Sequence, residues 1–140
     1  MKLIDKSNAV DVPIRVRYAD TDKMGIVYYG TYPIYFEIGR SEFMREKGLV
    51  YRKFEEQGYH LVVVNLEAKY YTSATYDDLL IVRTNISELK SRGLTFNYEI
   101  YKDGTLVVGG TTKHICINSE RKSTSIPPHL LKILKDAESA

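Results

Sequence analysis

One long helical pattern limits the possible folds of this chain more than any other feature. Between residues 31 and 47, apolar residues recur at steps of three and four, with charged residues between them. Thr31 is the expected N-cap, Pro33 suits the first turn, and Gly48 suits the left-handed position that ends a helix. Such a helix must bury its apolar stripe against another element of the fold.

Strand patterns account for most of the remaining sequence and supply that element. Asp103-Gly104, between two alternating runs, predicts a tight hairpin. The expected elements are a strand at residues 11–18, the long helix at 31–47, a short helix at 52–57, strands at 60–71, 79–89, 94–102 and 105–118, and a short C-terminal helix at 127–137. The sequence therefore predicts an α+β fold. An antiparallel sheet of about five strands wraps around one long central helix, in the order β-α-β-β-β-β.

Length, charge and cysteine content exclude several classes of protein. A chain of 140 residues with 44% apolar residues predicts a single domain, residues 1–140, with residues 1–10 as a mobile tail. A net charge of +2 argues against nucleic acid as a partner, and no apolar run is long enough for membrane insertion. The lone Cys116 allows no internal disulfide, and no secretory signal is recognisable. We therefore expect a cytoplasmic protein.

Several familiar catalytic sites are absent from the sequence. There is no Gly-x-Ser-x-Gly elbow and no phosphate-binding loop, and the three histidines are not spaced as metal ligands. We expect no metal and no cofactor. Cys116 alternates with isoleucines in a strand and is expected to be a packed thiol. Glu37 and Arg40 lie three residues apart on the long helix and are expected to pair with each other.

The segment that leads into the long helix has the residues that acyl-transfer chemistry requires. Asp20 and Asp22 lie two residues apart, and Gly25 and Gly30 would let the backbone approach a ligand closely. The start of a helix offers free N–H groups that can hold a developing oxyanion, and a nearby carboxylate can act as base or nucleophile. From spacing alone, an Asp-rich turn that only connects strand and helix remains an alternative.

This segment resembles the hotdog-fold acyl-CoA thioesterases, specifically the 4-hydroxybenzoyl-CoA thioesterase-like and YbgC-like group. The resemblance covers roughly residues 12–118. The matching residues are Arg17, Tyr18, Asp20, Thr21, Asp22, Gly25, Val27, Tyr28, Tyr29 and Tyr32, then Tyr35-Phe36-Glu37, Arg40, Glu42 and Phe43, with supporting blocks at Tyr76-Asp77-Asp78-Leu79-Leu80 and at Ser91, Arg92, Phe96 and Tyr98. The sequence lacks the histidine that some relatives have at Tyr29, and the proline that relatives often have near Thr72 or Ser73.

The resemblance implies specific roles for some of these residues. Asp22 is the expected catalytic carboxylate, as general base or as nucleophile, and Asp20 the structural one. The backbone N–H of Tyr29 is the expected group that polarises the thioester carbonyl. Gly25, Tyr28 and Tyr32 are expected to contact the substrate. Lys90 and Arg92 are the best candidates for the coenzyme A phosphates, and the weaker candidates are Lys69, Arg83 and Lys113.

The expected activity is hydrolysis of an acyl-CoA thioester to the free acid and coenzyme A, which is part of the substrate. The resemblance also implies a homodimer or a homotetramer made of two dimers, with active sites between subunits. Two alternatives stay open. A non-catalytic binding partner of acyl-CoA or of an acyl carrier protein is one. A dehydratase of the same fold is the other, although it would need a histidine near the central helix, and residues 19–48 contain none.

Overall fold

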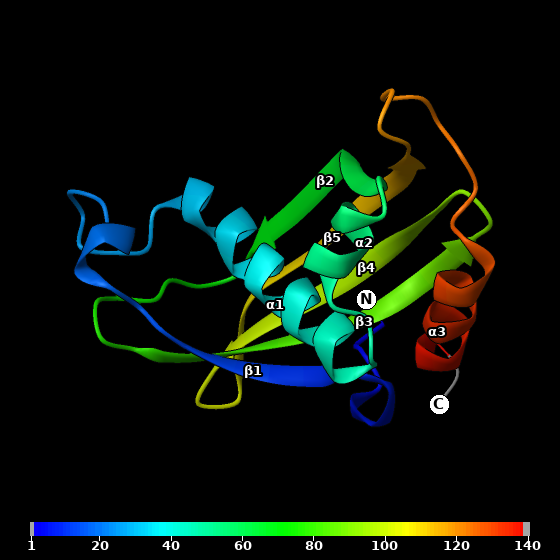
Figure 1. Cartoon of the computed structure of the whole chain (residues 1–140). Coiled ribbons are helices and arrows are strands. Elements are labelled where there is room, and N and C mark those ends of the chain that lie inside the picture. The colour runs from blue at the N-terminus through cyan, green and yellow to red at the C-terminus, as the bar shows by residue number, and fades with distance from the viewer. Residues whose placement is uncertain (1, 139–140) are drawn as a thin grey trace.

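The computed structural model describes residues 2–138 and shows one five-stranded antiparallel sheet, in the order β1-β3-β4-β5-β2 (Figure 1). The strands are β1 (Val10–Arg15), β2 (His60–Tyr70), β3 (Leu79–Lys90), β4 (Gly93–Lys102) and β5 (Thr105–Ile117), and the α-helices are α1 (Tyr32–Glu46), α2 (Tyr51–Glu56) and α3 (Pro128–Glu138). Three short 3-10 turns lie at Lys6–Asn8, Tyr18–Asp20 and Tyr29–Thr31. The predicted fold class and element order are confirmed.

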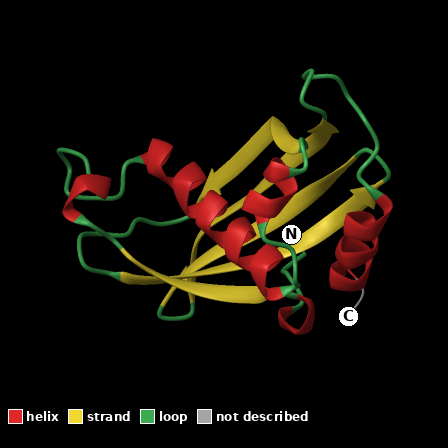
Figure 2. Cartoon of the chain, in the orientation of Figure 1, coloured by secondary structure: helices red, strands yellow, loops and turns green. Residues whose placement is uncertain are grey.

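Helix α1 lies across one face of the sheet and buries its apolar stripe there (Figure 2). The ring of Phe36 stacks on the ring of Tyr98 in β4, with the two ring centres 4.4 Å apart and the planes at 8°. At Gly39, an added Cβ would lie 2.8 Å from the Cγ1 of Val82 in β3. Only glycine therefore allows this approach of helix and sheet, which places the helix directly on its main core partners.

Most predicted boundaries agree with the structure to within a residue or two, and the end of the first strand is the exception. The first strand ends at Arg15, because the chain turns into a 3-10 turn that leaves Tyr18 78% exposed. Thr31 is the N-cap residue of α1, as predicted, but its side chain makes no capping hydrogen bond, because residue 31 is already helical and belongs to the 3-10 turn before the helix. Gly48 does end the helical segment at a φ of +95°, as predicted.

The segment predicted as a mobile tail contacts the sheet instead. Ile4 is buried, and its N–H donates a 2.9 Å hydrogen bond to the carboxylate of Glu99 in β4. Asp5 accepts a hydrogen bond from the Ser7 N–H and caps the first 3-10 turn. The prediction missed this because the adjacent apolar residues Leu3 and Ile4 show no periodicity, and only Ile4 of the two is buried. Met1 lies outside the described residues.

Between residues 2 and 138, no helix combines the length and apolar character needed to cross a membrane.

Candidate active site

The carboxylate of Asp20 fixes the loop between β1 and α1 to the helix. It accepts hydrogen bonds from the backbone N–H of Arg17 at 3.0 Å, from the Arg17 guanidinium at 2.9 Å and from the hydroxyl of Tyr35 at 2.9 Å. Burial alone would raise the pKa of Asp20, but these hydrogen bonds outweigh burial and hold the pKa below its ordinary value. Asp20 is therefore a structural anion that joins the loop to the second turn of α1.

Asp22 lies on a tight reversal of the chain beside the start of α1. Thr21 forms an antiparallel bridge with Val27, and the Asp22 N–H donates to the carbonyl of Ile26 at 2.9 Å. The Asp22 carboxylate is half-buried and accepts the N–H of Met24 at 2.8 Å. Gly25 completes the reversal at a φ of +81°, in the left-handed region that favours glycine.

The negative charge of Asp22 also acts on Tyr28, the residue just before the 3-10 turn that leads into α1. The pKa of Tyr28 is raised, mainly by its hydrogen bond with Tyr29. The negative charge of Asp22 makes a smaller contribution to this rise. The Tyr28 N–H also donates to the Asp20 carbonyl at 2.9 Å. The two ends of the reversal are thus held together.

The backbone N–H of Tyr29 opens the 3-10 turn that leads into α1. Among residues 2–138 this N–H has no hydrogen-bond acceptor, as is usual at the start of a helix. The ring of Tyr28 packs against Gly30, the residue after Tyr29. An added Cβ at Gly30 would lie 2.7 Å from the Tyr28 Cε2. Tyr32 is buried, and burial, with a smaller contribution from Tyr70, raises its pKa to about 12. It therefore stays a neutral phenol at physiological pH.

The structure gathers Asp22, Gly25, Tyr28, Tyr29 and Tyr32 at one end of α1, but it places the predicted phosphate ligands elsewhere. Lys90 and Arg92 lie at the β3–β4 turn, at the opposite end of the sheet (Figure 1). There they line a hollow of about 140 Å³ together with Lys113, one of the weaker candidates. Lys90 pairs with Glu88 at 3.4 Å, and Arg92 donates to the Ser123 hydroxyl at 3.2 Å.

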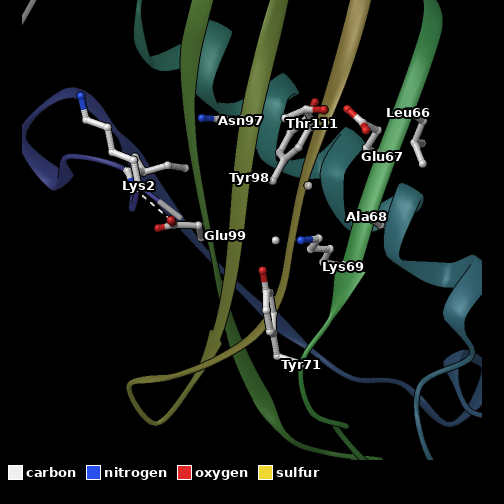
Figure 3. Close-up of a pocket in the computed structure, with 13 residues that line it drawn as sticks. Lys2, Leu66, Glu67, Ala68, Lys69, Tyr71, Asn97, Tyr98, Glu99 and Thr111 are labelled. Carbon is white, nitrogen blue, oxygen red and sulfur yellow. Dashed lines mark hydrogen bonds between the residues drawn. The ribbon is translucent and has the colours of Figure 1, made fainter.

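The other two candidate cations are elsewhere. Arg83 makes two hydrogen bonds to the carboxylate of Asp11, at 2.9 and 3.0 Å, and its guanidinium lies over the ring of Tyr101, so it is a structural residue of the β1–β3 pair. Lys69 lies on the face of the sheet turned away from α1, in a hollow of about 580 Å³ that it shares with Glu67 and Glu99 (Figure 3). This hollow is separate from the start of α1.

A cavity that sequence reasoning missed lies beneath α1. It has a volume of about 320 Å³, and its lining includes Arg40, Tyr51, Leu61 and His114. The expected Glu37–Arg40 pair does not form: Arg40 instead turns toward the sheet, with its guanidinium 3.5 Å from the Tyr98 hydroxyl. Polar residues scattered over α1, β4 and β5 carry no common sequence signal, so only the fold could reveal this cluster.

Four side chains beneath α1 form a hydrogen-bonded chain with a fixed direction. His114 Nδ1 lies 3.1 Å from the carbonyl of Leu61, which can only accept, so Nδ1 carries the proton. His114 Nε2 then accepts from the Thr112 hydroxyl at 2.8 Å, which in turn accepts from the Tyr98 hydroxyl at 2.5 Å. Arg40 donates at the other end. Burial, aided by the charge of Arg40, lowers the pKa of His114 to about 4, so the imidazole is neutral near pH 7.

No group of three or more His, Cys, Asp or Glu side chains within residues 2–138 is arranged to hold a metal ion. The geometry at the start of α1 thus consists of a half-buried carboxylate, unpaired backbone N–H groups and tyrosine rings. Such a set can activate water or attack a carbonyl carbon, and it can stabilise the oxyanion that results.

Comparisons with known proteins give a consistent result. The family model described as the Thioesterase-like superfamily matches residues 16–134. The acyl-CoA thioesterase YbgC of Haemophilus influenzae is 34% identical over 112 residues, which cover 79% of this chain and 82% of that protein. Among solved structures, the DHNA-CoA thioesterase from Staphylococcus aureus has a TM-score of 0.90 at 29% identity, covering 94% of this chain and 91% of that one. A hypothetical protein from Thermus thermophilus has a TM-score of 0.89 at 34% identity, covering 91% and 98%.

Replacing His114 by glutamine should remove part of the acid sensitivity of the fold. The folded-state pKa of His114 is about 4, against 6.5 for the free side chain, so the unfolded chain binds this proton first as the pH falls. The stability that neutral His114 provides is complete above about pH 6.5 and falls by about 3 kcal/mol between there and pH 4, at 1.36 kcal/mol per unit. Urea unfolding of both proteins from pH 7 to pH 4 measures the difference. Equal pH slopes for the two proteins would contradict the prediction.

Proposed function

The chain belongs to the thioesterase-like superfamily, and on that premise we propose that it hydrolyses an acyl-CoA thioester to a free carboxylic acid and coenzyme A. The observation that carries this proposal is the placement of Asp22. Its carboxylate is half-buried beside the start of α1, where the Tyr29 N–H is without an acceptor among the described residues. Asp20, by contrast, is occupied by Arg17 and Tyr35.

In the proposed reaction, the thioester carbonyl oxygen accepts the Tyr29 N–H. Water attacks the carbonyl carbon while the Asp22 carboxylate takes its proton, and the tetrahedral oxyanion forms against the partial positive charge at the helix start. Collapse of this intermediate expels the coenzyme A thiolate. Alternatively, the Asp22 carboxylate attacks directly and forms an anhydride that water then hydrolyses. A single turnover in heavy-oxygen water separates these routes, because only the second places label in the Asp22 carboxylate.

We further propose that two copies of the chain build the site. Strand β2 is an unpaired edge of the sheet, and its helix-facing side leaves Val63, Leu66 and Tyr70 between 43% and 49% exposed. Exposed apolar edges of this kind favour pairing with another strand. Antiparallel pairing of β2 with the same strand of a second copy would bring the His60 end of one copy next to the Tyr70 end of the other.

This pairing would also explain why the candidate phosphate ligands lie far from Asp22 within one copy. In the sheet, Val62 of β2 is in register with Ile115 of β5, which is in register with Gly93, next to Arg92. The cations are therefore at the His60 end of β2. In a dimer they would approach the Asp22 of the other copy, where the coenzyme A phosphates would need them. A tetramer of two such dimers is compatible with this arrangement.

Changing Asp22 to asparagine should abolish turnover without harm to the fold. The amide oxygen can still accept the Met24 N–H, so the loop keeps its shape, but the base or nucleophile is lost. We expect kcat to fall by about 100-fold or more, as is usual for an essential acid–base group. The measurement is thiol release from a panel of aliphatic and aryl acyl-CoAs.

Asp20→Asn is the matched control. It weakens the contact with the Arg17 guanidinium, so it should lower the unfolding midpoint while the folded fraction still turns over. Wild-type turnover in Asp22→Asn would refute the proposed mechanism. Tight binding of acyl-CoA by the wild type without release of thiol would favour the non-catalytic alternative.

The double change Lys90→Ala with Arg92→Ala should weaken substrate binding through the coenzyme A phosphates. We expect KM for acyl-CoA to rise about tenfold, whereas KM for the same acyl group on pantetheine, which lacks the nucleotide, should stay the same. Lys69→Ala, on the outer face of the sheet, is the control and should behave like the wild type. An unchanged KM in the double variant would remove these two residues from the proposed site.

Placing a lysine at Leu66 should break the proposed dimer. A charge on the exposed side of an edge strand opposes pairing with another edge, so we expect a monomer by light scattering, with loss of thioesterase activity. Leu79 is exposed to a similar degree but lies on β3, so Leu79→Lys tests whether any surface lysine has the same effect. A dimeric and active Leu66→Lys variant would exclude β2 as the interface.

A further inference from the structure

The edge strand β2 reaches the start of α1 through one side chain, Tyr70. Its hydroxyl donates a 3.2 Å hydrogen bond to the carbonyl oxygen of Tyr29, and its ring contacts the rings of Tyr29 and Tyr32. We propose that Tyr70 is a positioning residue for the oxyanion site and that it holds the backbone N–H of Gly30 as a second donor there. This inference rests on the proposed function.

The geometry of one peptide bond connects Tyr70 to that donor. The Tyr29 carbonyl and the Gly30 N–H belong to the same planar trans peptide, so they point in opposite directions and rotate together. A hydrogen bond at the carbonyl oxygen therefore sets the direction of the N–H on the other side. Among the described residues the Gly30 N–H, like that of Tyr29, has no acceptor. Hydrogen bonding at the oxygen also polarises the peptide and strengthens its N–H as a donor.

Tyrosine rings pack around this peptide. The Tyr70 ring stands at 89° to Tyr29 with centres 6.4 Å apart, and at 62° to the buried Tyr32 with centres 5.7 Å apart. Such edge-on contacts are the favoured arrangement of aromatic pairs. The ring of Tyr28 lies against Gly30 and leaves no room for a side chain there. These contacts favour one orientation of the peptide before substrate binds, which is what oxyanion stabilisation requires.

The next residue along the chain, Tyr71, lies just past the end of β2 and provides a matched control. Side chains of consecutive residues in extended backbone point to opposite faces of a sheet. Tyr71 accordingly lines the hollow on the face turned away from α1, with its ring among Lys69 and Glu99 (Figure 3). Tyr70→Phe and Tyr71→Phe each remove one phenolic oxygen from adjacent positions, but only Tyr70→Phe removes the contact with the Tyr29 carbonyl.

Steady-state kinetics tests this proposal. The substrate is an acyl-CoA that the wild type hydrolyses, and its concentration is varied up to saturation so that kcat and KM are measured separately. We expect Tyr70→Phe to lower kcat about tenfold, the loss typical of one hydrogen bond that acts in the transition state. KM and the unfolding midpoint should not change, because Phe keeps the ring contacts. In carbon-13 NMR the carbonyl signal of Tyr29 should move upfield in Tyr70→Phe and stay in place in Tyr71→Phe.

Each other result overturns a specific claim. If Tyr70→Phe turns over like Tyr71→Phe while Asp22→Asn is inactive, the role of Tyr70 is refuted and the proposed function stands. If Tyr70→Phe lowers the unfolding midpoint and raises KM along with its loss of kcat, Tyr70 is a structural residue and the inference is wrong. If the wild type releases no thiol from any acyl-CoA, the proposed function fails, and this inference fails with it.

Discussion

The packing of α1 directly on the sheet is the constraint on which the rest of the structure depends. The helix has no other surface to cover its apolar stripe, and two glycines let it come close. On the helix, Gly39 lies against β3; on the sheet, an added Cβ at Gly110 would lie 2.6 Å from the Cζ of Phe36. With Phe36 stacked on Tyr98, the position of the helix axis is set. The start of α1, with its unpaired N–H groups, is therefore held by the core itself and not by the loop that carries Asp22.

Two aspartates in nearly adjacent positions have opposite surroundings, and this difference separates the structural carboxylate from the one that we propose for catalysis. Asp20 is 4% exposed and accepts from a guanidinium, a phenol and a backbone N–H, so its negative charge is fully used within the protein. The described contacts of the Asp22 carboxylate are different, with one backbone N–H as hydrogen-bond donor and no cation within ion-pair distance. A carboxylate without a cation or a side-chain donor can accept a proton or attack a carbon. A carboxylate that holds a loop in place is not available for either reaction.

The sequence predicts the architecture well because periodic patterns report burial. The stripe of α1 and the Asp103-Gly104 turn both appear in the structure as expected, the latter with φ values of +48° and +79°. Local details that depend on neighbours distant in the sequence were beyond such patterns. The N–H of the buried Ile4 donates a hydrogen bond to Glu99, which is 95 residues away in the sequence. Arg40 does not pair with Glu37 and donates to the hydroxyl of Tyr98 instead.

The same limit applies to the site. The cluster around Asp22 and Tyr29 is contiguous in sequence, so a motif could identify it, and the structure brings its members together. Lys90 and Arg92 were predicted from their charge and their place near a hairpin end, and neither property says where that hairpin lies relative to Asp22. Tyr70 was not singled out at all. Its role depends on a hydrogen bond to a residue 41 positions away, and it is one of twelve tyrosines with the same local signal.

Strand β2 takes part in two polar arrangements, one beneath α1 and one at the start of that helix. At its beginning, the carbonyl of Leu61 receives the last hydrogen bond of the chain that runs from Arg40 to His114. At its end, Tyr70 donates to the Tyr29 carbonyl at the start of the helix. Between these two points the strand is an unpaired edge with exposed apolar side chains. A partner that covered this edge would restrict both ends of β2 together, so assembly of the protein and alignment of the proposed oxyanion donors would be coupled through a single strand.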